Sequence, residues 1–417
     1  MEDGDTSSLF PIGKSAQEKG LSYVPDCYVV PPPQRSNLTP ETTNVPVVDL
    51  AGLHDPGGRS HIIKDIGSAS RGLGFFQVNG HKRLNRPKSL LGCGLCGQPT
   101  LSIKAVRPNL VLALIRAWPV HAQSLRLYRA WLGLPGFSHG FQCTQDYQPW
   151  VCQSVLDGAL SSAFDFFNLP MEKKLEFMSN DVQKPVRYGT SLKDGIDKVQ
   201  FWRIFLKHYA HPLKDWVELW PKSPANYREN MGKYATDVRK LALELTAAIT
   251  ESLAIGPTYL NNKMEEGMQV MAINCYPACP KPELALGLPP HSDYSCFTIL
   301  LQSCQGLEIM DRNDGTWRVV LKLDSALQVH VGDHLEVLSN GLYKSVVHRA
   351  ALNTERTRIS IASLHSLGMD EKMETAKELI DEQHRKNYKE SSFRDFLNFL
   401  SANDIAEGKS FIQTLKI

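Results

Sequence analysis

The 417-residue sequence has little net charge, no apolar run long enough to span a bilayer and no visible secretory signal. Its net charge of +2 gives no general preference for nucleic acid or anionic membrane. Residues 1–5 are acidic and no basic segment followed by an apolar one comes after them. The longest apolar run, residues 109–120, contains Arg116 and is shorter than the ~20 residues that a membrane-spanning helix needs. We therefore expect a cytoplasmic protein that contacts neither membrane nor nucleic acid.

Disulfides are also not expected. The nine cysteines are odd in number and irregularly spaced, which argues against a disulfide framework and favours reduced thiols. Cys93 and Cys96 form a single Cys-x-x-Cys pair without a second pair or a surrounding βαβ pattern. Such a pair is weak evidence for a zinc or redox site.

Apolar periodicity divides the chain into helical and strand-like parts. Helical spacing occurs at 60–72, 155–169 and 224–253, and Ser392 is a predicted N-cap. Short strands are predicted early in the chain and then in a series of eight, at 45–50, 74–78, 269–274, 296–302, 306–310, 317–320, 327–331, 334–338, 343–348 and 358–364. The turns between the eight strands favour an antiparallel sandwich or jelly roll, so the predicted fold class is α+β with helices around a β core.

This pattern predicts four regions. They are an irregular N-terminal arm at 1–44, a helical and mixed region at 45–253, a jelly-roll core at 254–366 and C-terminal helices at 367–417.

A candidate metal site begins at His291 and Asp293. Side chains two apart on a strand share a face, so this imidazole and this carboxylate point the same way. His348, at the end of another predicted strand, would complete a two-His, one-carboxylate set of the kind that binds iron(II) with three positions open. The spacing alone is weak evidence, because His334 and Glu336 repeat it nearby and most strand histidines are structural.

A candidate anion site lies at Arg358 and Ser360, which share a face ten residues after His348. A guanidinium that faces inward needs a carboxylate partner, which is either a protein side chain or a ligand. Asn274 and Tyr276 can add an amide and a phenol to the same cavity.

Together these motifs resemble the plant 2-oxoglutarate- and iron(II)-dependent dioxygenases, which share the isopenicillin N synthase-like fold. The resemblance covers about 45–78 and 154–417 and rests on Asn274-x-Tyr276-Pro277, His291-x-Asp293, Gly332-Asp333, His348 and Arg358-x-Ser360. It implies a double-stranded β-helix core with iron(II) on His291, Asp293 and His348. It also implies 2-oxoglutarate as co-substrate on Arg358, Ser360, Tyr276 and Asn274, with ascorbate as a candidate addition.

The implied reaction oxidises 2-oxoglutarate to succinate and CO₂ while hydroxylating or desaturating a small molecule. We favour a flavonoid-like specialised metabolite and a flavanone 3-dioxygenase-like activity. The candidate pocket residues, taken from their positions in the family pattern, are Tyr188, Phe201, Tyr294, Phe297, Leu364 and Ser366. Three alternatives stay open: a hormone oxidase, an ascorbate-using or keto-acid-independent oxidase of the same fold, and a catalytically silent binding protein.

Residues 80–152 depart from the family pattern. From residue 81 to 152 there are nine Lys/Arg and one acidic residue, a net charge of +8 that leaves −6 for the rest of the chain. Three of the seven Trp and four of the nine Cys also lie there. We interpret about 80–152 as translated intron or a gene-model error; the alternative is a genuine inserted module, which could disable catalysis.

Overall fold

The computed structural model describes residues 21–36, 41–79, 150–190, 199–403 and 408–417. The Cys93 and Cys96 pair and most of the anomalous stretch, residues 80–149, lie outside this range.

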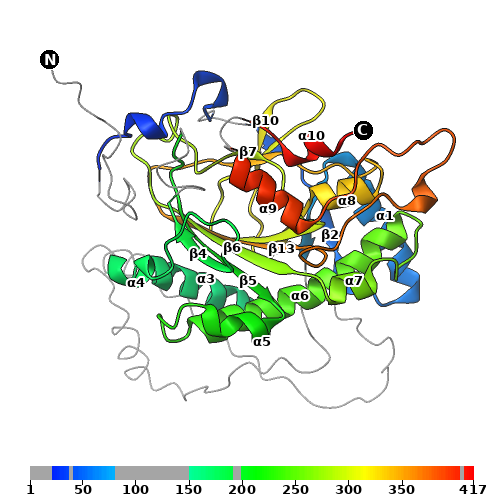
Figure 1. Cartoon of the computed structure of the whole chain (residues 1–417), viewed down its shortest axis with the longest axis horizontal. Coiled ribbons are helices and arrows are strands. Elements are labelled where there is room, and N and C mark those ends of the chain that lie inside the picture. Colours follow the sequence, from blue (N-terminus) through cyan, green and yellow to red (C-terminus); the bar gives the residue numbers. More distant parts are fainter. Residues whose placement is uncertain (1–20, 37–40, 80–149, 191–198, 404–407) are drawn as a thin grey trace, which may run out of the picture. The chain divides into compact units, whose positions relative to one another are not determined.

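Two β-sheets form the centre of the described chain (Figure 1). The larger has the order β2 (Val47–Asp49), β3 (Phe75–Asn79), β11 (Leu327–Val331), β8 (Phe297–Gln302), β13 (Arg358–His365), β6 (Gln269–Tyr276), β5 (Ile204–His211) and β4 (Val186–Gly189). The smaller has the order β1 (Thr42–Thr43), β10 (Trp317–Val320), β9 (Leu307–Met310), β12 (His348–Ala350) and β7 (Leu288–His291). Except for β1 with β10 and β2 with β3, neighbouring strands are antiparallel. The predicted jelly-roll core is confirmed.

Helices flank the larger sheet. They are α1 (Pro56–Gly72), α3 (Gln153–Phe167), α4 (Met171–Leu175), α5 (Leu213–Trp216), α6 (Tyr227–Ser252), α7 (Asn261–Glu265), α8 (Asp333–Leu338), α9 (Phe393–Ala402) and α10 (Phe411–Leu415). The long helix α6 packs against α3 and α1, and both α3 and α6 contact β13. Helix α9 lies on the opposite side of this sheet from α3 and α6 (Figure 1). The sheet is therefore covered on both faces, which explains why β6 and β8 read as nearly continuous apolar runs.

Some predicted elements are wrong. Residues 334–338, expected as a strand, belong to helix α8, in which every residue is buried. A short element that is buried all round has no apolar stripe, so periodicity cannot distinguish helix from strand. Only His348 of the predicted strand 343–348 is in a strand. Strands β4, β5 and β7 were not predicted; two of the four residues of β7 are prolines, which usually argue against a strand.

No helix among the described residues is long and apolar enough to cross a bilayer. The six cysteines in this part of the chain are free thiols, as expected.

Removing the N-cap of α9 should destabilise the protein. The Ser392 hydroxyl accepts from the Asp395 amide, and the Ser392 amide donates to the Asp395 carboxylate at 2.9 Å, which forms the capping box. We expect Ser392→Ala to lower the free energy of unfolding by about 1 kcal/mol in chemical denaturation. Ser410→Ala at the N-cap of α10 is the control, because Ser410 makes no capping hydrogen bond. An equal loss in both variants would contradict the prediction.

Candidate active site

A cavity of about 420 Å³ is lined by residues from both sheets and from the C-terminal helices. The larger sheet contributes alternate residues of β5, β6 and β13, whose register places Phe205, Asn274 and Ser360 in one row across the sheet. Because side chains alternate between faces, the whole row faces the cavity. The smaller sheet contributes β7 and β12, and α9 adds aromatic side chains.

The predicted metal ligands meet in this cavity. His291 at the end of β7 is paired directly with His348 at the start of β12, which places their rings 4.3 Å apart. Asp293 follows β7, and its Oδ1 lies 3.8 Å from Nε2 of His291 and 3.9 Å from Nε2 of His348. One ligand atom from each of the three residues falls within 4.8 Å of the others. The pairing of β7 with β12 thus brings together two histidines that are more than fifty residues apart in the sequence.

Backbone carbonyls orient both imidazoles. Nδ1 of His291 is 2.8 Å from the Pro289 carbonyl, and Nδ1 of His348 is 3.1 Å from the Val346 carbonyl. A carbonyl accepts only, so Nδ1 carries a proton in both rings, and Nε2 is the nitrogen on the side of Asp293 that could bind a metal. This is the arrangement that metal-binding histidines normally show.

Electrostatics keep the cluster in the protonation state that a cation needs. Burial, followed by the neighbouring His348, lowers the pKa of His291 to about 4. Burial alone would raise the pKa of Asp293, but His348 and His291 outweigh it and lower the pKa. At neutral pH the cluster therefore presents a neutral His291 and an ionised Asp293.

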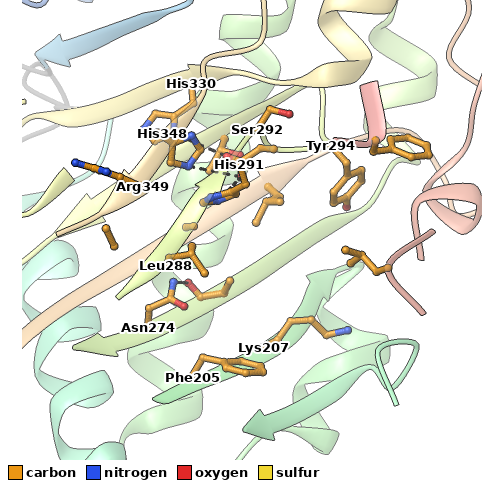
Figure 2. A pocket seen from close by; sticks show the side chains of 18 of the residues that line it. Phe205, Lys207, Asn274, Leu288, His291, Ser292, Tyr294, His330, His348 and Arg349 are labelled. Atoms are coloured by element: carbon orange, nitrogen blue, oxygen red, sulfur yellow. Dashed lines mark hydrogen bonds and ion pairs between the residues drawn. The ribbon is translucent and has the colours of Figure 1, made fainter. Parts of the chain in front are cut away.

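A fourth histidine, His330 of β11, lies beside the cluster (Figure 2). Its Nδ1 is 3.8 Å from Oδ2 of Asp293, and its ring centre is 4.8 Å from that of His348. Burial lowers its pKa to about 3, and neither ring nitrogen has a hydrogen-bond partner among the described residues. It faces the carboxylate oxygen that does not point at the other two histidines.

The predicted anion site lies on β13 and β6. Arg358 is 2% exposed, and it donates from Nε to the Cys304 carbonyl at 3.2 Å and from Nη2 to Gln302 at 2.8 Å. Nη1 has no partner, and Arg358 forms no ion pair within the described part of the chain. Its guanidinium lies 5.0 Å from the ring centre of Tyr276. Asn274 accepts from Arg203 at 3.0 Å.

Two glycines make room for these side chains. A Cβ at Gly306, whose φ is +151°, would lie 2.8 Å from Cδ of Arg358. A Cβ at Gly287 would lie 2.4 Å from the ring of Tyr276. Both distances are shorter than real Cβ contacts, so any side chain at either position would push the guanidinium or the phenol out of place.

Two of the six predicted pocket residues, Tyr294 and Leu364, line the cavity. The other four are buried elsewhere: Tyr188 packs against Phe166, Phe201 against Val30 and Leu286, Phe297 against His365, and Ser366 hydrogen-bonds to His334. The lining residues that sequence reasoning missed include Arg187, Arg203 and Lys207, which lie on or just before the unpredicted strands β4 and β5.

Comparison with known proteins identifies the family of this chain. Residues 267–366 match the 2OG-Fe(II) oxygenase superfamily, and residues 138–223 match the N-terminal region of non-haem dioxygenases in morphine synthesis. The chain is 43% identical over 375 residues to flavanone 3-dioxygenase 3 of Oryza sativa subsp. japonica, covering 89% of this chain and 93% of that protein. It is 49% identical over 276 residues to the rice protein 2-oxoglutarate-dependent dioxygenase 21, chloroplastic, covering 66% and 82%.

A solved structure, JOX2 in complex with 2OG, Fe and JA, superposes with a TM-score of 0.68 at 26% identity and 94% coverage of both chains. The chain thus has the fold of a non-haem iron oxygenase, and it brings together two histidines and an aspartate that could hold a metal ion. It belongs to the 2OG-Fe(II) oxygenase superfamily. It is an oxidoreductase, a dioxygenase that uses iron(II) and 2-oxoglutarate.

The residues present fit both groups. Two imidazoles and one carboxylate are the donor set that iron(II) takes in this class of site. A buried guanidinium with an unpartnered Nη1 fits a dicarboxylate co-substrate.

Breaking the buried ion pair next to His348 should destabilise the core. Arg349 Nε donates to Glu308 at 2.6 Å, and each side chain is 1% exposed. We expect Glu308→Gln, which leaves this arginine buried without its counter-charge, to lower the free energy of unfolding by about 3–5 kcal/mol in chemical denaturation. The control Asp237→Asn removes an exposed pair with Lys240 and should cost under about 1 kcal/mol. A Glu308 variant no less stable than the control would refute the prediction.

Proposed function

We propose that His291, Asp293 and His348 bind the iron(II) of this dioxygenase. The observation that supports this is the meeting of their three ligand atoms within 4.8 Å in a cavity. Both imidazoles are held by backbone carbonyls, so little ordering would be needed when the metal binds.

Arg358 and Ser360 would bind the distal carboxylate of 2-oxoglutarate, with Tyr276 beside it and Asn274 near the other end. The support is the buried Arg358, which has no carboxylate partner among the described residues although burial of an uncompensated charge is costly. Its Nη1 is available for a charge-assisted hydrogen bond. Gly306 and Gly287 keep Arg358 and Tyr276 in position.

When bound, iron(II) and 2-oxoglutarate would supply electrons that activate dioxygen, and the keto acid would be released as succinate and CO₂. The chain's own residues then decide which C–H bond is exposed to that chemistry. The larger sheet holds the co-substrate end, and the aromatic residues of α9 would exclude water from the substrate end.

The substrate is proposed to be a planar specialised metabolite, flavonoid-like, that is hydroxylated or desaturated. Support comes from the name of the rice relative and from the cavity, whose lining includes Phe205, Tyr294, Phe393, Phe396 and Leu364. A cavity of about 420 Å³ lies within the usual range for small-molecule sites. A cytoplasmic location and the absence of nucleic-acid and membrane partners stay predictions.

The four predicted regions are also proposals, and so is the interpretation of residues 80–152 as translated intron or a gene-model error. The net charge of +8 supports the latter, whereas the family match that begins at residue 138 assigns 138–152 to the dioxygenase pattern. Tryptic peptides from residues 84–137 in native tissue would contradict a gene-model error.

Removing a metal ligand should abolish iron binding as well as turnover. We expect His348→Ala and Asp293→Ala to weaken binding of iron(II), measured by anaerobic titration calorimetry, by more than about 100-fold. Substrate-dependent release of succinate should be lost in parallel. His384→Ala on the surface is the matched control. Unchanged iron affinity in either ligand variant would refute the assignment.

Removing the guanidinium should affect the co-substrate and spare the metal. We expect Arg358→Met to weaken 2-oxoglutarate binding to the metal-loaded protein by about 30-fold or more, because it removes one partner of a buried charge pair. Arg356→Met, an exposed neighbour, should have no effect. Failure of 2-oxoglutarate to bind the wild-type protein would instead favour the keto-acid-independent alternative.

A further inference from the structure

The described lining of the cavity contains more cationic than anionic side chains. The described lining contains six Lys or Arg side chains and one carboxylate, Asp293, which belongs to the metal cluster. Of these cations, Arg358 belongs to the predicted co-substrate site and Arg349 is paired with Glu308. The remaining cations include Lys207 of β5, which was not anticipated from the sequence.

Strand register locates Lys207 relative to the co-substrate site. Arg358 pairs with Tyr276, and four residues further along β13 Ala362 pairs with Ala272, which in turn pairs with Lys207. Four residues of strand span roughly 13 Å. Ala362 and Ala272 have small side chains, so the row that ends at Lys207 leaves room in the cavity. The row of Ser360 and Asn274 lies between this row and Arg358.

Figure 2 shows the same arrangement, with Lys207 and Phe205 on the far side of Asn274 from the cluster of His291 and His348. Contacts also connect Lys207 to the aromatic side chains at this end of the cavity. Its Nζ is 4.9 Å from the ring centre of Tyr209, which lies 6.2 Å from Phe393 of α9. Phe393 stacks at 4.5 Å on Tyr294, another lining residue.

The ammonium group of Lys207 is under-used by the protein. It donates one hydrogen bond, to the Val182 carbonyl at 2.9 Å, although an ammonium has three donors. It forms no ion pair within the described residues. Burial and then the neighbouring Arg187 lower its pKa to about 7, and the carboxylate of Asp181 offsets these two effects only in part. A bound anion would add the counter-charge that is still missing.

We propose that Lys207 selects an anionic substrate by binding a carboxylate or phenolate at the end of the cavity away from Arg358. The inference rests on the proposed function, because it assumes that Arg358 is occupied by 2-oxoglutarate. The acidic group would lie in the row of Ala362 and Ala272, under the aromatic side chains of α9, and the rest of the substrate would extend towards the metal cluster.

The test compares acidic compounds with neutral analogues of nearly the same shape. The full chain, loaded with nickel(II) and 2-oxoglutarate, is titrated by calorimetry with cinnamate and methyl cinnamate, and with a flavanone phenol and its methyl ether. At least one acid should bind about 10- to 100-fold more tightly than its neutral analogue, as expected for a charge-assisted hydrogen bond. The pair that shows the preference distinguishes a carboxylate from a phenolate.

Lys207→Met keeps the stem and removes the charge, so it should reduce that preference to less than about threefold. Lys207→Arg should retain it, and Lys214→Met, on the exposed face of α5, is the matched control. If Lys207→Met weakens the binding of the acid and of its neutral analogue equally, Lys207 has a structural role and the proposal is overturned. The absence of any preference for acids in the wild-type protein would also overturn it. Loss of 2-oxoglutarate binding in the same titrations would count against the proposed function instead.

Discussion

The site depends on the antiparallel register of β6 and β13. Eight consecutive residue pairs, from Arg358 with Tyr276 to His365 with Gln269, hold these strands together. A slip by one residue would turn every second side chain from the cavity to the helical face. The same ladder extends to β5, so one register sets the row of Ser360 and Asn274, which we propose for the co-substrate, and the row that ends at Lys207.

The second sheet is what makes a metal centre possible. His291 and His348 come from strands that pair directly, and Asp293 leaves the end of one of them. Backbone carbonyls on each strand fix the ring orientations, so the cluster is held by strand geometry rather than by mobile side chains. The buried pair of Arg349 and Glu308 ties the next residue of β12 to β9.

Acidic and basic side chains are unevenly distributed around the cavity. The metal cluster contains the only carboxylate among the described lining residues, while guanidinium and ammonium groups line the larger sheet. Buried charges of this kind need counter-ions; Nη1 of Arg358 has no partner among the described residues, and Asp181 compensates Lys207 only in part. These two groups are the basis for the two anion sites that we propose, one for 2-oxoglutarate and one for an acidic group of the substrate.

Much of this could be predicted from the sequence. Turn residues predicted the jelly roll, because turns depend on local geometry. Period-2 spacing led us to expect His291 and Asp293 on one strand face, but Asp293 follows β7 and does not belong to it. Tertiary structure decided what depends on pairing between distant strands. Phe201 and Phe297 proved to be core residues, and buried α8 was misread as a strand, because burial on all sides erases periodicity. Lys207 entered the cavity only through the register of β5 against β6, which no local signal in the sequence encodes.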